Sequence, residues 1–104
     1  MTITTVGDYQ LHVDGEGFLT EYDEWDEAVG EKLANQIDIT MTDAHWKAIR
    51  FLREDFVEQG ETATLRRIST IGGIPIKELF ELFPGKPAKK MAYIAGLPKP
   101  RGCV

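Results

Sequence analysis

The segment from Thr42 to Gly60 carries the clearest helical pattern in the sequence and constrains the fold most. Large apolar side chains recur on one face of this segment at helical spacing: Trp46, Ile49, Leu52 and Phe56. Thr42 is a favourable N-cap, and Gly60 is typical of the position just after a helix. We therefore expect this segment to form the central helix of the core.

The residues before this helix predict a β-hairpin and one further helix. Two β-prone runs, 3–6 and 9–13, are separated by Gly7-Asp8, which favours a two-residue turn. A two-stranded hairpin is marginal alone, so it must pack on helices. From Asp23 onward, apolar residues recur every four positions, at Trp25, Val29, Leu33 and Ile37.

The residues after the central helix predict three shorter helices. The first spans 64–71 and would bury Leu65, Ile68 and Ile71 before Gly72-Gly73. The second runs from Pro75 to Phe83 and would bury Ile76, Leu79, Phe80 and Phe83. The last begins at Pro87, packs Met91, Ile94 and Ala95, and stops at Gly96. The fold class is therefore α+β: a small, mostly helical bundle with an N-terminal β-hairpin over residues 1–95, and a flexible arm over 96–104.

Composition fits one cytoplasmic domain. The chain of 104 residues is 42% apolar and 28% charged, as in ordinary soluble proteins, with no run long enough to span a membrane. Its N-terminus lacks the pattern of a signal peptide, and a single cysteine cannot build a disulfide framework. Because a free thiol persists best in a reducing compartment, we expect the protein to be cytoplasmic. We also expect it to hold no metal and no cofactor.

The formal charge of −5 is unevenly distributed. Residues 1–61 hold 15 acidic and 4 basic side chains, whereas residues 62–104 hold 2 acidic and 8 basic ones. The basic part could be steered to an acidic partner surface, or the two parts could simply attract each other in the folded chain. The acidic part is not expected to contact nucleic acid.

The arm has the composition of an extended segment that carries a thiol. Pro98 and Pro100 flank Lys99, so this segment can neither continue a helix nor join a sheet interior. As an extended stalk of ~3.1 Å per residue, positions 97–103 would reach roughly 20 Å beyond the body. Gly102 would let the thiol of Cys103 turn. The alternative is an ordinary buried cysteine, which has little apolar company here.

A thiolate at Cys103 would be a nucleophile that can take up sulfur as a persulfide and pass it on. Lys99 and Arg101 favour the thiolate, and the α-carboxylate of Val104 opposes it. Gly96, Pro98, Lys99, Pro100, Arg101 and Gly102 are the candidate residues for positioning the arm and binding a partner.

The C-terminal pattern resembles the DsrC/TusE family of sulfur-carrier proteins. The resemblance rests on the runs 85–90 and 94–100, the penultimate Cys103, and upstream segments at 14–19, Trp25, 45–53 and 79–84. It implies a monomeric sulfurtransferase-type carrier that acts between a sulfur donor and a sulfur acceptor. The acceptor would be a tRNA-thiolating enzyme or a sulfite-reductase-type system. We expect the chain itself to bind neither a membrane nor nucleic acid directly.

One departure from the family's pattern bears on mechanism. Members that serve dissimilatory sulfite reductase carry a second cysteine at the position of Ala92. A cycle that closes an intrachain disulfide is therefore not available, and the resemblance is to the single-cysteine, TusE-like branch. The region between residues 71 and 76 is also shorter than the family leads us to expect.

Two other classes of function remain open from the sequence. The two short helices around Gly72-Gly73 suggest a helix-turn-helix DNA-binding regulator, with Arg66, Arg67 or Lys77 on phosphates. A pI of 5.0 argues against it. The other class is a non-catalytic redox or interaction module, which would keep its partner after Cys103→Ser.

Overall fold

The structure is a computed structural model that describes residues 2–100. Strands β1 (Thr2–Val6) and β2 (Tyr9–Val13) are followed by a short 3-10 helix, η1 (Tyr22–Glu24), and five α-helices. These helices are α1 (Glu27–Gln36), α2 (Asp43–Gln59), α3 (Leu65–Thr70), α4 (Ile76–Leu82) and α5 (Pro87–Ala95). The predicted α+β class, with an N-terminal hairpin and a mostly helical remainder, is confirmed.

The hairpin forms as the sequence predicts, and it is tied to the segment that follows. β1 and β2 pair antiparallel, with Val6 opposite Tyr9 around the predicted turn, where Gly7 adopts φ +62°. His12 donates its backbone N–H to Glu24 at 2.8 Å, and its Nδ1 lies 2.6 Å from the other carboxylate oxygen. The half-buried His12 thus fastens β2 to η1.

α2 has the predicted bounds and is fixed at both ends. Thr42 and His45 form a capping box at its start, and Gly60 ends it with φ +73°. The His45 ring is almost fully buried, and its Nε2 lies 2.9 Å from the carbonyl oxygen of Leu82 in α4. A ring that caps its own helix therefore also connects α2 to α4.

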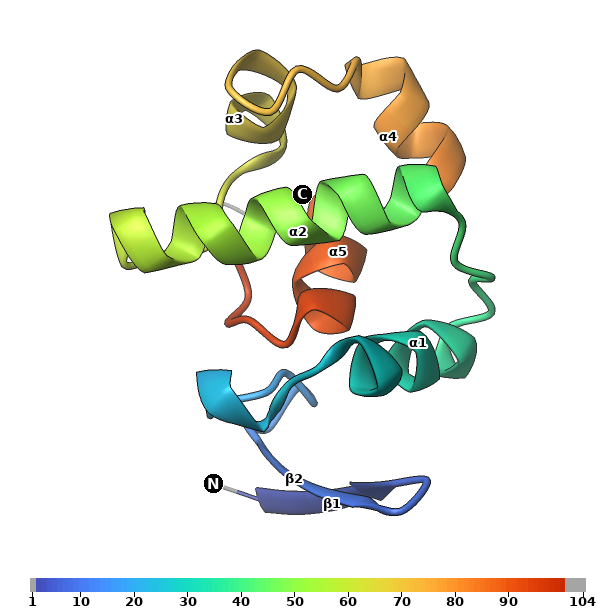
Figure 1. Cartoon of the computed structure of the whole chain (residues 1–104), viewed down its shortest axis with the longest axis vertical. Helices are drawn as coiled ribbons and strands as arrows, with labels where there is room; N and C mark the ends of the chain where they lie inside the picture. The colour runs from blue at the N-terminus through green and yellow to red at the C-terminus, as the bar shows by residue number, and fades with distance from the viewer. Residues whose placement is uncertain (1, 101–104) are drawn as a thin grey trace.

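α5 occupies the middle of the molecule. Figure 1 shows it between α2 on one side and α1 on the other, with the hairpin beyond α1 and with α3 and α4 beyond α2. One apolar cluster is built mainly from α2 and α5, with α3 and α4 packed on it, and a second joins the hairpin to α1. Trp25 and Tyr93 pack against both clusters. The C-terminal end of α5 is consequently held by the core on several sides.

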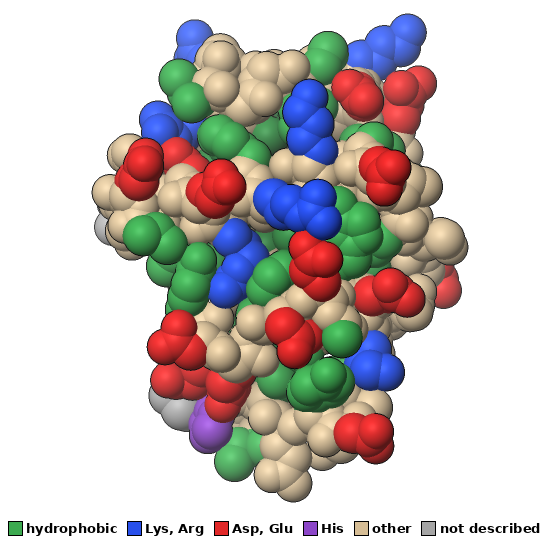
Figure 2. Space-filling view, viewed as in Figure 1, with side chains coloured by type: hydrophobic (Ala, Val, Ile, Leu, Met, Phe, Trp, Pro, Cys, Tyr) green, Lys and Arg blue, Asp and Glu red, His purple; other side chains and the backbone are tan. Residues whose placement is uncertain are grey.

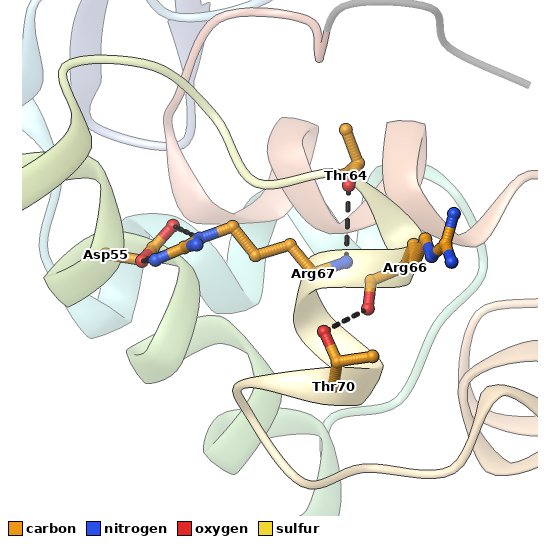
Figure 3. Close-up of polar contacts among 5 residues, drawn as sticks. All are labelled: Asp55, Thr64, Arg66, Arg67 and Thr70. Carbon is orange, nitrogen blue, oxygen red and sulfur yellow. Dashed lines mark hydrogen bonds and ion pairs between the residues drawn. The ribbon is translucent and has the colours of Figure 1, made fainter.

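α3 is fastened to α2 by an ion pair whose carboxylate, that of Asp55, is buried. The Arg67 side chain donates to both carboxylate oxygens of Asp55, at 2.7–3.1 Å, and Figure 3 shows Arg66 pointing away from this pair. Thr64 caps the helix by accepting from the backbone N–H of Arg67. Arg67 was a candidate phosphate contact of the helix-turn-helix hypothesis, but its guanidinium is already engaged by a carboxylate.

Three apolar residues that were predicted to be buried are exposed. Ile71, Ile76 and Phe80 are 61%, 43% and 46% exposed. α3 ends at Thr70, so Ile71 lies in the turn after the helix. α4 is only seven residues long and buries the face that carries Leu79, which leaves Ile76 and Phe80, four residues apart, on another face.

The acidic and basic parts of the chain are joined by ion pairs in the folded molecule. Acidic side chains are spread over the face shown in Figure 2, with lysine and arginine among them. Two ion pairs join the acidic part of the chain to the basic part, Asp55–Arg67 and Glu16–Lys99. The attraction between the two parts that was one alternative from the sequence is therefore present.

Candidate functional site

The segment that leads to Cys103 starts at a well-defined helix end. Gly96 has φ +69°, in the left-handed region, and donates its N–H to the carbonyl oxygen of Tyr93. The N–H of Leu97 donates to the carbonyl oxygen of Ala92 at 3.0 Å. These two bonds form a Schellman motif, in which the residue after the glycine normally packs back on the helix. Leu97 does so and is fully buried.

Two side chains from outside α5 bind its last carbonyl groups. The indole Nε1 of Trp25 donates to the carbonyl oxygen of Ile94 at 2.7 Å, and Nη1 of Arg53 donates to that of Ala95 at 2.7 Å. The last carbonyl groups of a helix have no partner within the helix, so these contacts satisfy them. α5 therefore ends in a fixed position relative to α2 and to the segment before α1.

Arg53 is itself held between two aromatic rings. Its guanidinium carbon lies 3.9 Å from the centroid of the Tyr22 ring and 4.1 Å from that of Trp25. Its Nη2 also donates to the backbone oxygen of Tyr22 at 3.0 Å. Burial lowers the pKa of Arg53, and the nearby Tyr22 and Asp23 act in the opposite direction. Arg53 thus links α2, η1 and the end of α5.

The next residues continue along the body. Thr62, which is 5% exposed, donates its hydroxyl to the carbonyl oxygen of Pro98 at 2.7 Å. Nζ of Lys99 lies 3.3 Å from Oε1 of Glu16, in the turn after β2. Pro98 and Lys99 are exposed, whereas Pro100 is buried. The expectation that the chain leaves the body at Leu97 is therefore wrong, because positions 97–100 are docked on it.

The predicted site residues divide into two groups. Gly96 is the predicted helix stop, and it is followed by Pro98 and Lys99, which are exposed, and by Pro100, which is buried. Arg101, Gly102 and Cys103 lie outside the described residues. Ala92, at the position of the family's second cysteine, is fully buried. Among residues 2–100 there is no group of three side chains suited to hold a metal ion, and no helix that is long and apolar enough to cross a membrane.

Sequence reasoning missed the residues that hold the base of this segment. Trp25 was assigned to a helix face, Arg53 and Glu16 were named only within segments of the family resemblance, and Thr62 was given no role. No local pattern joins these positions, which lie 36 to 83 residues from their partners. The burial of Leu97, in contrast, does have a local signal, because a glycine followed by an apolar residue at a helix end favours a Schellman motif.

Comparisons with known proteins show the family of this chain. A model of the family described as DsrC-like proteins matches residues 5–104 of the chain. The chain belongs to this family. The match includes Cys103 and the whole segment that starts at Gly96.

Curated and solved relatives cover nearly the full chain. A sulfurtransferase TusE of Photorhabdus laumondii is 36% identical over 102 residues, 91% of this chain and 92% of the relative. The solution structure of DsrC from Allochromatium vinosum is 36% identical, with a TM-score of 0.81 and coverage of 98% and 97%. The oxidised γ-subunit of dissimilatory sulfite reductase (DsrC) of Archaeoglobus fulgidus gives 36% identity, a TM-score of 0.75 and coverage of 99% and 100%.

Proposed function

We propose that this chain is a sulfur-relay protein that carries sulfane sulfur as a persulfide on Cys103. The observation that carries the proposal is that the family match extends through the single cysteine, and that the segment leading to it starts from a rigid base. The relatives are sulfurtransferases and DsrC proteins. This family membership does not support a DNA-binding regulator or a non-catalytic redox module.

The transfer needs only thiol exchange. The Cys103 thiolate attacks the terminal sulfur of a donor persulfide, the donor S–S bond breaks, and the donor leaves as a thiolate. The new persulfide on Cys103 gives its outer sulfur to an acceptor by the same displacement. The oxidation state of the transferred sulfur does not change, so the carrier needs no external oxidant, reductant or cofactor. With Ala92 in place of a second cysteine, release by an intrachain disulfide is not available.

The anchored base has a clear use in such a relay. Positions 101–104 follow directly after Pro100, which is buried, so the thiol is tethered close to a fixed point on the body. A short tether raises the effective concentration of the thiol at a partner that binds the body. Arg101 and Gly102 would then adjust the thiol within the partner's site.

The proposed acceptor is a tRNA-thiolating enzyme. The alternative within the same function is an acceptor that belongs to a dissimilatory sulfur pathway. We place the protein in the cytoplasm as a monomer that works between a donor and an acceptor protein. Loss of 2-thiouridine from tRNA on deletion of the gene would support the first assignment. Unchanged 2-thiouridine would exclude it.

The direct test is intact-mass analysis of reduced protein after incubation with a sulfane-sulfur donor. The wild-type chain should gain the mass of one sulfur, and Cys103→Ser should gain none. The thermal midpoint of Cys103→Ser should equal that of the wild type, which excludes misfolding of the variant. No gain by the wild-type chain from either a polysulfide or a cysteine desulfurase would refute the carrier function.

A further inference from the structure

A surface hollow lies beside the start of α5. Its volume is about 450 Å³, and its apolar wall is formed by Phe18, Ile37 and Tyr93. The Phe18 and Tyr93 rings meet edge to face, with centroids 6.1 Å apart. Phe18 is almost fully buried, so the wall is fixed rather than a loose surface ring. The hollow can accept one bulky apolar side chain.

The rim of this hollow is cationic. Lys86, Lys89 and Lys90 line it, and within the described part of the chain none of the three forms an ion pair with a carboxylate. They stand on the first turn of α5 and on the residue before it, where the helix dipole adds partial positive charge. Three lysines that pair with no carboxylate of the described residues, placed around an apolar wall, favour a ligand that is both anionic and apolar.

One acidic residue on the rim connects the hollow to the C-terminal segment. Glu16 lines the hollow and is also the partner of Lys99, at 3.3 Å. The side chains of Lys99 and Glu16 are 40% and 54% exposed, so this ion pair is weak and easily exchanged. A carboxylate that enters the hollow would repel Glu16 and compete for Lys99.

We propose that the hollow is the docking site for an acidic segment of the sulfur-exchange partner, one with a bulky apolar side chain between its carboxylates. The apolar side chain fills the hollow, the carboxylates pair with Lys86, Lys89 and Lys90, and docking weakens the Glu16–Lys99 pair. Partner binding is thereby coupled to release of the segment that leads to the thiol. This inference rests on the proposed relay function, because the occupant belongs to the donor or acceptor.

Charge complementarity and shape select a protein segment over nucleic acid. The apolar wall of Phe18, Ile37 and Tyr93 offers no partner to a phosphate group, whereas it can bury an apolar side chain. The chain as a whole carries −5, which opposes the long-range attraction on which nucleic-acid affinity depends. A flexible acidic peptide can pair with the lysines and bury its apolar side chain in the same contact.

The test is an NMR titration of isotope-labelled protein with a short blocked peptide that has a central phenylalanine flanked by glutamates. Amide shifts should cluster on residues of the hollow and extend to Glu16 and Lys99. Lys89→Glu/Lys90→Glu should weaken binding by about tenfold or more, because it replaces two attractions with repulsions. Lys47→Glu/Lys77→Glu changes the net charge equally at exposed lysines outside the hollow and should have much less effect.

Further variants separate the contributions. Lys89→Gln/Lys90→Gln removes the two positive charges without adding repulsion, so its loss of peptide affinity should be intermediate. It also serves as a second test if Lys89→Glu/Lys90→Glu fails to fold. Glu16→Gln should tighten binding, because it removes the repulsive carboxylate. A peptide with glutamine in place of glutamate, or with serine in place of phenylalanine, should bind more weakly than the original.

The inference would be overturned if the two double reversals weakened binding equally, or if the shifts mapped to another face. Tighter binding of a single-stranded RNA at the same lysines would also overturn it, by making the occupant a nucleic acid. Sulfur loading from a small polysulfide needs no docking, so Lys89→Glu/Lys90→Glu should load Cys103 like the wild type. Normal loading with no peptide binding would refute the docking site alone, whereas failed loading of the wild type would refute the relay.

Discussion

Gly96 is the residue at which the helical body turns into the segment that leads to Cys103. Its backbone has φ +69°, which side chains with a Cβ rarely adopt. A Cβ at this position would also lie 2.6 Å from a ring carbon of Trp25, the residue whose indole caps the end of α5. Both the backbone conformation and the available space therefore require glycine here.

We predict that Gly96→Ala lowers the free energy of unfolding by roughly 2–4 kcal/mol, the sum of backbone strain and displacement of Trp25. Urea denaturation measures this loss. Gly60→Ala is the matched control, because Gly60 has φ +73° but a Cβ there meets no atom within 4 Å. The control should lose only about 1 kcal/mol. Equal losses in the two variants would show that contact with Trp25 has no energetic weight.

Glu24 gives a prediction about pH. The backbone N–H of His12 is the main cause that lowers the pKa of Glu24, and burial acts in the opposite direction. A carboxyl group whose pKa is lower in the folded state stabilises the fold above its ordinary pKa, near 4.5. This stabilisation is lost as the pH falls through the folded-state pKa. Chemical denaturation at several pH values should therefore give a higher free energy of unfolding for the wild type than for Glu24→Gln near neutral pH. The difference between the two should shrink in acid.

Glu31→Gln controls for the removal of one negative charge, because Glu31 is exposed on α1. If the difference between wild type and Glu24→Gln stayed constant down to acidic pH, the hydrogen bonds from His12 would not favour the ionised form of Glu24.

Residue by residue, the sequence predicts what depends on local geometry. Thr42, Gly60 and Gly96 were identified as helix caps or stops because each acts on its own backbone. Arg53 and Thr62 could not be identified, since their partners are carbonyl groups at distant positions. A backbone carbonyl carries no sequence signature, so such contacts appear only once the fold brings the segments together.

At the scale of elements, the long helix was easier to predict than the short ones. α2 has 17 residues, so single exceptions have little effect on the pattern of its apolar stripe. α3 and α4 have six and seven residues, about two turns each, so their apolar residues do not define one buried face. Ile71, Ile76 and Phe80 were predicted inward for this reason and are exposed.

The segment after α5 is an element in its own right, held by few contacts. We predict that Thr62→Val speeds hydrogen exchange of the Leu97 amide by up to about tenfold, because the hydroxyl of Thr62 no longer binds the carbonyl oxygen of Pro98. The substitution keeps the shape of the side chain. Exchange measured by NMR at the Leu97 amide, which donates to Ala92, reports the opening.

Thr70→Val is the control for this experiment. Its hydroxyl also donates to a backbone carbonyl, that of Arg66, but within α3. This variant should leave exchange at Leu97 unchanged. An equal acceleration in both variants would mean that general destabilisation, rather than loss of the Thr62–Pro98 contact, opens the segment.

At the scale of the whole molecule, two apolar clusters must act as one core. The hairpin and α1 form the smaller cluster, and a two-stranded hairpin is not stable alone. Trp25 and Tyr93 are the half-buried residues that pack on both clusters. Trp25 also binds α5 through its indole N–H and stacks on Arg53. From these contacts we infer that Trp25 couples the hairpin to the helical part of the molecule.

We therefore expect Trp25→Ala to cost about 3 kcal/mol and to uncouple the two clusters. Hydrogen exchange should then show the amides of β1 and β2 opening at a lower free energy than those of α2, whereas in the wild type the two differ less. Trp46→Ala is the control, because Trp46 is also half-buried but packs on the larger cluster. Trp46→Ala should lower the opening free energy of both sets of amides by similar amounts. If Trp25→Ala also lowered the opening free energies of the hairpin and α2 amides by equal amounts, the two clusters would still be coupled. Tyr93 alone would then be enough to join them, and the end of α5 would not depend on Trp25 for its attachment to the hairpin.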